Sequence, residues 1–416
     1  MLIDQYERED VFAQVPDLAQ ETDPVLRKLD GLLDDDELYQ QVRSDFGKRY
    51  RFTLVHGRHS TPVEVLLRML ILKHLYQWSY QETEARVKDS LVLRWFCRVG
   101  FHRLPDASTL WRWEQTLRPE TVHALNDRVV QLARQAKVTK GRKLRLDATC
   151  VQTEIHHPTD SGLLVDSVRV LSRFVQRAKG LVKDQMSNVQ QTCRSRLRTA
   201  RQVAQTLHRQ LRRKAEDKEA QQKELSQKLI GTTEHMVRQS QQVIAALAQQ
   251  TGQQARRLLT QATEVLPLVE FGRHVVLDEV EGGIVTRYQI LEHPTEHGQA
   301  VAAVAHHCAL FAHPPGLVAG DRGVHSADTE EKLKAAGVKR VAIPASGKLS
   351  AERQALEHTR SWKRGYRWRA GIEGRIASLR RDYGWRTSRY HGLDGMERWL
   401  GLGVIASNLR RIALAK

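Results

Sequence analysis

A candidate catalytic cluster lies near the C-terminus and consists of Tyr366, Arg369, Glu373 and Arg380. Helix-forming residues around it predict one helix over residues 351–381. Steps of three, four and seven residues place the cluster on one helical face, in a stripe about 60° wide. The pattern fits either ion pairing on a surface helix or a metal-binding carboxylate between phosphate-binding guanidinium groups. Both interpretations stay open on spacing alone.

Two aspartates occupy positions where catalytic carboxylates often occur. Asp147 lies in a run in which Leu144 and Leu146 alternate with charged residues, the pattern of a half-buried strand. Asp321 directly follows the apolar run 317–319 and a glycine. Ligands and catalytic groups gather at strand ends of α/β sheets, although an aspartate there is often only a turn or cap residue.

The elements around these aspartates predict a mixed α/β sheet. After the first strand, the pattern indicates a hairpin, a helix, a strand, a second helix and a third strand. They cover residues 274–291, 298–311, 316–319, 327–336 and 338–343. This order is typical of helices packed on a mixed sheet.

The N-terminal part of the chain predicts short helices. Residues 1–50 form an N-terminal arm or short helices, and residues 51–140 form an all-α domain with capping boxes expected at Thr61–Glu64 and Ser79–Glu82. In this domain Arg112 lies between two tryptophans on a brief helix after a turn. That arrangement fits either a helix offered to a DNA groove or a packing and dimerisation bundle.

A long helical insertion separates the first strand from the hairpin. We place it at residues 162–265, within a catalytic domain covering 141–416. Residues 167–262 hold 19 Lys and Arg, 6 Asp and Glu, and 18 Gln, a net charge of +13. Such helices could lie along DNA, dimerise, or simply present a solvated face. The candidate phosphate contacts are Arg212, Arg213 and Lys214.

Composition limits the class of protein. The 416 residues carry a net charge of +18, which favours a polyanionic partner such as nucleic acid. With 41% hydrophobic residues the chain can form a core, so a wholly disordered basic protein is excluded. No apolar run is long enough for a membrane span, and four scattered cysteines argue against a zinc knuckle or disulfide scaffold. We expect a soluble, cytoplasmic protein without a membrane partner.

The motifs together resemble those of DDE transposases of bacterial insertion sequences, in the broad IS4/IS5-like group. The run from Leu146 to Thr149 is similar to the family's first-aspartate region, and Ala319–Gly323 is similar to its second. The spacing of Tyr366, Arg369, Glu373 and Arg380 matches its Tyr, Arg, Glu, Lys signature, with Arg380 in place of the lysine. Arginine carries the same positive charge as lysine, and its guanidinium group can also bind a phosphate through two parallel hydrogen bonds.

The resemblance implies a ribonuclease H-like catalytic domain that carries the helical insertion and follows the all-α domain. It further implies that Asp147, Asp321 and Glu373 are catalytic and hold two Mg²⁺ or Mn²⁺ ions. Tyr366, Arg369 and Arg380 would contact DNA.

The expected function is metal-dependent cleavage at transposon ends followed by transfer of the 3′-OH strand into target DNA. Double-stranded DNA, as terminal inverted repeats and as target, is the expected partner, bound by a homodimer associated with the bacterial nucleoid. Two alternatives remain: a DNA-binding regulator derived from a transposase without catalysis, and another ribonuclease H-like nuclease.

Overall fold

The computed structural model describes most of the chain, namely residues 1–6, 23–49, 59–153, 160–183, 191, 193–211, 218–248, 272–291, 298–345 and 349–415. The chain divides into two compact units. Unit 1 comprises residues 1–154 and 273–416, and unit 2 comprises residues 155–272. Each unit is described by itself below.

A six-stranded mixed sheet forms the centre of unit 1, with the strand order β3-β2-β1-β4-β5 and β6 paired to β1. The strands are β1 (Lys143–Thr153), β2 (Gly272–Val280), β3 (Ile284–Ile290), β4 (Leu317–Ala319), β5 (Arg340–Ala342) and β6 (Thr387–Ser388). Strands β2 and β3 are an antiparallel hairpin, whereas β4 runs parallel to both β1 and β5. This sheet confirms the predicted ribonuclease H-like α/β fold.

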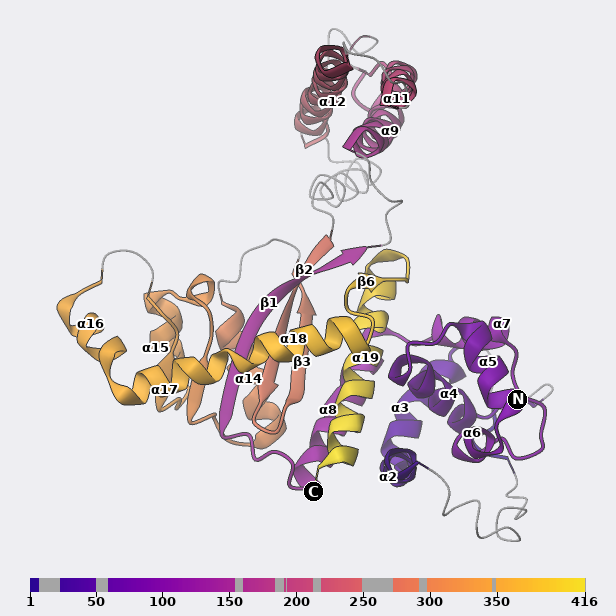
Figure 1. Cartoon of the computed structure of the whole chain (residues 1–416), viewed down its shortest axis with the longest axis vertical. Helices are drawn as coiled ribbons and strands as arrows, with labels where there is room; N and C mark the ends of the chain where they lie inside the picture. The colour runs from indigo at the N-terminus through magenta and orange to yellow at the C-terminus, as the bar shows by residue number, and fades with distance from the viewer. Residues whose placement is uncertain are drawn as a thin grey trace. The chain divides into compact units, whose positions relative to one another are not determined.

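The second half of the chain also forms helices around this sheet. They are α14 (Gln299–Phe311), α15 (Ala327–Ala335), α16 (Ala351–His358), α17 (Arg360–Arg369), α18 (Gly371–Asp382) and α19 (Gly392–Leu414), with the 3₁₀ turn η3 (Arg322–Val324) after β4. Figure 1 shows α17 and α18 crossing one face of the sheet, where α17 contacts β4 and β5 and α18 contacts β1.

The N-terminal helices belong to the same compact unit. They are α2 (Pro24–Leu32), α3 (Asp36–Gly47), α4 (Val63–Leu75), α5 (Tyr80–Asp89), α6 (Leu91–Phe96), α7 (Ala107–Glu114) and α8 (Pro119–Gln135). All residues of α4 are buried, and α19 packs against α2, α4 and α8 as well as β3. One hydrophobic core runs from α2 to α19, so the structure groups the expected segments 1–50 and 51–140 with the sheet.

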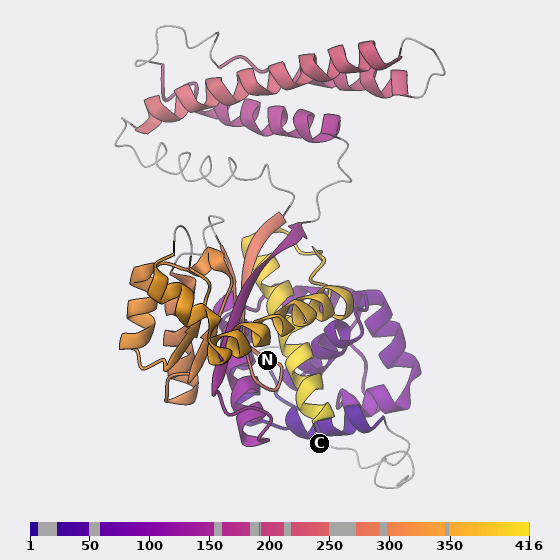
Figure 2. The same ribbon diagram turned by 60° about the vertical axis from the view of Figure 1, so that its left-hand side comes forward.

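Unit 2 is a helical body with its own core. Its described helices are α9 (Asp160–Ala178), α11 (Leu197–Leu211) and α12 (Lys218–Ala248), which all pack on one another (Figure 2). Val168, Leu229 and Val243 lie in a separate hydrophobic cluster at that contact. The structure therefore has the predicted helical insertion between β1 and β2.

Two local predictions are wrong in detail. The capping box at Thr61–Glu64 is absent because α4 begins at Val63, one residue later than predicted, and Pro62 occupies the N-cap. The single helix over 351–381 is three helices, interrupted at Thr359 and Ala370. By contrast, the Ser79–Glu82 capping box is confirmed, with both reciprocal hydrogen bonds present.

In the described part of the chain, no helix combines the length and the apolar character needed to cross a lipid bilayer.

Candidate active site

Strand β1 presents Asp147 toward the α17–α18 junction. The Asp147 side chain is 16% exposed, and its Oδ1 accepts a hydrogen bond from the Ala148 amide at 2.9 Å. Its Oδ2 accepts from Arg369 Nη1 at 3.1 Å. The same guanidinium donates through Nη2 to Glu373 Oε1 at 3.0 Å. Arg369 therefore bridges two of the three candidate carboxylates.

The third carboxylate, Asp321, reaches the same edge of the sheet through the strand register. Strands β1 and β4 are parallel neighbours, and Arg145 on β1 pairs with Ala319 on β4. Asp147 and Asp321 each lie two residues beyond this pair. Asp321 caps η3, and its Oδ1 accepts from the Arg322 amide at 2.7 Å. Carboxyl ends of parallel strands form the usual ligand edge of an α/β sheet.

Electrostatics couple the three acids. Burial raises the pKa of the Asp147 carboxyl, and the positive charge of Arg369 opposes this rise. The negative charges of Asp321 and Glu373 raise the same pKa further. A carboxyl that senses both other acids lies in a shared negative field, which is the electrostatic condition for attracting a cation.

The α17–α18 junction is fixed to β1 by Arg145. This side chain donates from Nη1 to the Trp368 carbonyl at 2.7 Å and is itself paired with Glu279. In a continuous helix the Trp368 carbonyl would accept from the amide four residues later, and here it accepts from Arg145 beside the break at Ala370. The predicted stripe spans two helices, and Arg369 and Glu373 still meet across the break.

The other two stripe residues lie on either side of this centre. Arg380 donates to Thr149 Oγ1 and to the Cys150 carbonyl near the end of β1, the latter at 3.0 Å. Tyr366 is half-buried and stacks on Trp362, with a ring-centroid distance of 5.2 Å. The Arg369 guanidinium lies 5.6 Å from the centre of the Tyr366 ring.

The remaining predicted DNA contacts lie elsewhere or outside the described residues. Arg112 is exposed on α7, which packs on α4 and α5 and lies apart from α17 and α18 in both views (Figures 1 and 2). Its neighbour Trp113 is buried against Phe46, while Trp111 is 50% exposed. Arg212, Arg213 and Lys214 lie outside the described residues.

Sequence reasoning missed the side chains that support the site. Arg145 precedes Asp147 by two residues and so shares its strand face, a signal that alternation could have supplied. Glu279 and Arg375 gave no such signal, because their pairing depends on the hairpin lying beside β1 beneath α18. Glu279 is almost fully buried between Arg145 and Arg375.

A divalent cation fits the chemistry of this donor set, since hard ions such as Mg²⁺ and Mn²⁺ prefer carboxylate oxygens. Among the described residues, no group of three His, Cys, Asp or Glu side chains lies close enough together to hold a metal ion. Asp147 and Glu373 instead converge on the positive charge of Arg369. The site thus fits a cation in its ligand types and in its shared field.

Fold and site together define the class: a ribonuclease H-like domain with carboxylates on β1, after β4 and on α18. Residues 14–116 match a family model described as "Transposase domain (DUF772)". Residues 330–413 match one described as "Transposase DDE domain". Both matches support the resemblance of this chain to a DDE transposase of an insertion sequence.

Among curated proteins, the chain is similar to "Uncharacterized protein ORF8 in nfe locus" of Rhizobium meliloti. It is 28% identical over 138 residues, which is 32% of this chain and 65% of the relative's own length. No solved structure matches the chain significantly.

Proposed function

We propose that the protein is a DNA transposase that cleaves DNA at transposon ends and joins the freed 3′-OH strand to target DNA. The observation that carries this proposal is that Arg369 bridges Asp147 and Glu373, while Asp321 follows the neighbouring parallel strand at the same edge of the sheet. Two Mg²⁺ or Mn²⁺ ions held by these carboxylates would supply charge stabilisation for an in-line phosphoryl displacement.

The surrounding residues have roles that follow from their contacts. Arg369 and Arg380 bind and orient phosphates beside the carboxylates, because a guanidinium fork matches two phosphate oxygens. Tyr366 positions the terminal nucleotide or hydrogen-bonds its backbone. Arg145 acts through the α17–α18 junction and keeps Glu373 facing β1.

The test uses purified full-length protein, labelled DNA carrying the inverted repeats that flank its coding sequence, a target plasmid and Mg²⁺. We expect Asp147→Ala, Asp321→Ala and Glu373→Ala each to lower cleavage and strand transfer at least about 100-fold, since each removes several kcal/mol of charge stabilisation. Glu352→Ala, on exposed α16, is the matched control and should act like the unaltered chain.

The outcomes separate the alternatives. Full activity in any of the three alanine variants contradicts the three-carboxylate assignment. Specific binding of the repeats without cleavage by the unaltered protein points to the regulator. Cleavage of any duplex without joining points to another ribonuclease H-like nuclease.

We also propose that the protein binds DNA as a homodimer within the bacterial nucleoid, with unit 2 contributing phosphate contacts. On α11, Arg198, Arg201 and Arg209 are exposed and fall within a stripe about 80° wide. The buried positions of α11, such as Ala200 and Leu207, lie on the opposite face. Arg212, Arg213 and Lys214 follow directly in sequence and extend this basic segment.

A further inference from the structure

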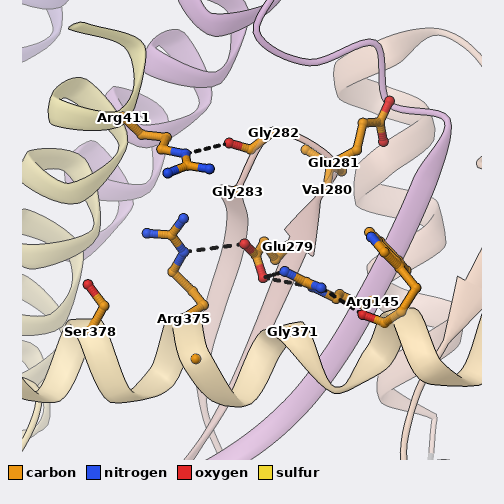
Figure 3. A pocket seen from close by; sticks show the side chains of 12 residues that line it. Arg145, Glu279, Val280, Glu281, Gly282, Gly283, Gly371, Arg375, Ser378 and Arg411 are labelled. Atoms are coloured by element: carbon orange, nitrogen blue, oxygen red, sulfur yellow. Dashed lines mark hydrogen bonds and ion pairs between the residues drawn. The ribbon is translucent and has the colours of Figure 1, made fainter. Parts of the chain in front are cut away.

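A polar cavity lies in unit 1, beside α18. Its volume is about 450 Å³, and the turn of the β2–β3 hairpin, α18 and the end of α19 surround it (Figure 3). Three arginines, Arg145, Arg375 and Arg411, project into it, and we call it the arginine pocket. Four glycines and two glutamates also line it.

Only one glutamate offsets the arginines inside the pocket. Glu279 Oε2 lies 2.7 Å from Arg145 Nη2, and its Oε1 lies 3.3 Å from Arg375 Nε. The other, Glu281, accepts hydrogen bonds from the main-chain amides of Lys140, Arg142 and Lys143. Figure 3 shows its carboxylate pointing away from Arg375 and Arg411.

Arg375 and Arg411 approach one another without a carboxylate between them. A Cβ placed on Gly283 would lie 2.3 Å from Arg375 Nη2 and 3.1 Å from Arg411 Nε, so both guanidinium groups surround one point. The Arg411 Nε donates to the Gly282 carbonyl at 2.8 Å, which holds the group over the pocket. Like charges this close repel one another, and an anion between them removes that repulsion.

The glycines on α18 keep the pocket open. Glycine weakens a helix relative to alanine, so its presence within one needs a reason. At Gly371 a Cβ would meet Arg145 Nη1 at 2.2 Å. At Gly374 nothing lies within 4 Å of a Cβ, so packing does not explain this glycine. A side chain at residue 374 would instead extend into the pocket.

We propose that the arginine pocket binds a backbone phosphate of DNA, at a position separate from the three carboxylates. Arginine forks match phosphate oxygens, and the excess positive charge selects an anion. Arg145 lines the pocket and precedes Asp147 by two residues on the same face of β1, so a strand held here passes near the candidate active site. The proposal rests on the proposed function, because DNA is the phosphate source that a transposase engages.

The test measures how DNA affinity depends on salt concentration, using the full chain and a duplex carrying the flanking repeats. Each lost phosphate contact lowers the slope of log affinity against log salt by about 0.9. We expect that reduction for Arg411→Gln, which removes a cation, and for Gly374→Glu, which fills the pocket with a negative charge. A matched control, Arg410→Gln on the exposed surface of α19, should keep the original slope.

An unchanged slope in both Arg411→Gln and Gly374→Glu overturns the proposal, as does an equal reduction in Arg410→Gln. Circular dichroism and a melting curve establish that each variant is folded. In a parallel arm, inorganic phosphate should raise the melting temperature of the unaltered chain more than that of Arg411→Gln. If phosphate does so while the DNA slopes stay equal, the pocket takes free phosphate and the DNA assignment is wrong.

These results stay separate from the test of the proposed function. If the unaltered chain neither binds nor cleaves the repeats, the transposase proposal fails first. If it binds and cleaves them with an unchanged slope in both pocket variants, only the arginine pocket is refuted.

Discussion

Arg369 is the residue on which the candidate site depends most closely. Its two Nη atoms reach Asp147 and Glu373, at 3.1 and 3.0 Å. The guanidinium thus offsets the repulsion between two carboxylates that β1 and α18 bring together. Its side chain is 13% exposed, so the guanidinium keeps some contact with solvent.

His74, in the buried helix α4, makes the stability of unit 1 depend on pH. Burial lowers its pKa to about 4, with Lys73 adding to the effect and Glu114 opposing it. Because the folded pKa lies below that of the unfolded chain, stability is complete above pH 6.5 and is lost as pH falls toward 4. This single histidine should cost about 2 kcal/mol of unfolding free energy by pH 5.

Urea unfolding at pH 7.5 and pH 5 checks this expectation. His74→Gln should reduce the loss between the two pH values, whereas the control His391→Gln, at an exposed position, should not. Burial also lowers the pKa of His307 to about 4, so part of the loss remains in the variant. The pKa of Glu114 is lowered to about 2, so the stability that this carboxylate contributes is lost only at more acid pH. An identical loss in His74→Gln and the unaltered chain would contradict the assignment.

The sequence predicted the carboxylates better than the groups around them. Asp147 and Asp321 could be placed because apolar strands and their ends are local patterns. Arg145, Glu279 and Arg411 meet only after the hairpin turn and α19 have come together, and spacing along the chain contains no trace of that contact. Asp278, on the same hairpin, is also buried and is paired with Arg287.

At the scale of elements, the α17–α18 junction shows how tertiary contacts override a helical pattern. The residues from 351 to 381 have the composition of one helix. The helical spacing correctly predicts that Arg369 and Glu373 are neighbours on one face. Beside the break at Ala370, Arg145, which is far away in sequence, donates to the Trp368 carbonyl, a tertiary contact that local spacing does not contain. Thr359 adds the earlier break by capping α17 through the Trp362 amide.

Two glycines on α18 offer a matched test of this junction. In Gly371→Ala the new methyl group would lie 2.2 Å from Arg145 Nη1 and would displace that side chain from the Trp368 carbonyl. We expect strand cleavage to fall about 10- to 100-fold as Glu373 shifts, and stability to fall about 1 to 3 kcal/mol as buried Glu279 loses a partner.

Gly374→Ala serves as the control for this pair, because its methyl group enters open space. It should keep full cleavage and gain up to about 1 kcal/mol from helix propensity. Cleavage rates and urea unfolding of both variants provide the comparison. Equal behaviour of the two variants would mean that the Arg145 contact does not position Glu373.

At the scale of the whole molecule, the basic charge is concentrated. Residues 155–271 contain 19 Lys and Arg against 10 Asp and Glu, a net charge of +9. This is half of the net charge of +18 of the whole chain. The described residues of unit 2 also have a hydrophobic core of their own. The core of unit 1 contains no described residue between Val151 and Val275. Each unit therefore has the packing needed to fold without the other.

Excision of residues 155–271, with a short loop joining β1 directly to its sheet neighbour β2, tests this division. We expect the shortened chain to unfold in one cooperative transition, since its core residues all remain. Its DNA affinity should be weaker, and the salt slope should fall by about 2 to 3 if Arg198, Arg201 and Arg209 each meet a phosphate. Reversing these three charges in the full chain should give a similar change, whereas Gln202→Ala with Gln205→Ala on the same helix should give none. A salt slope unaffected by either the excision or the charge reversal would assign unit 2 a role other than holding DNA.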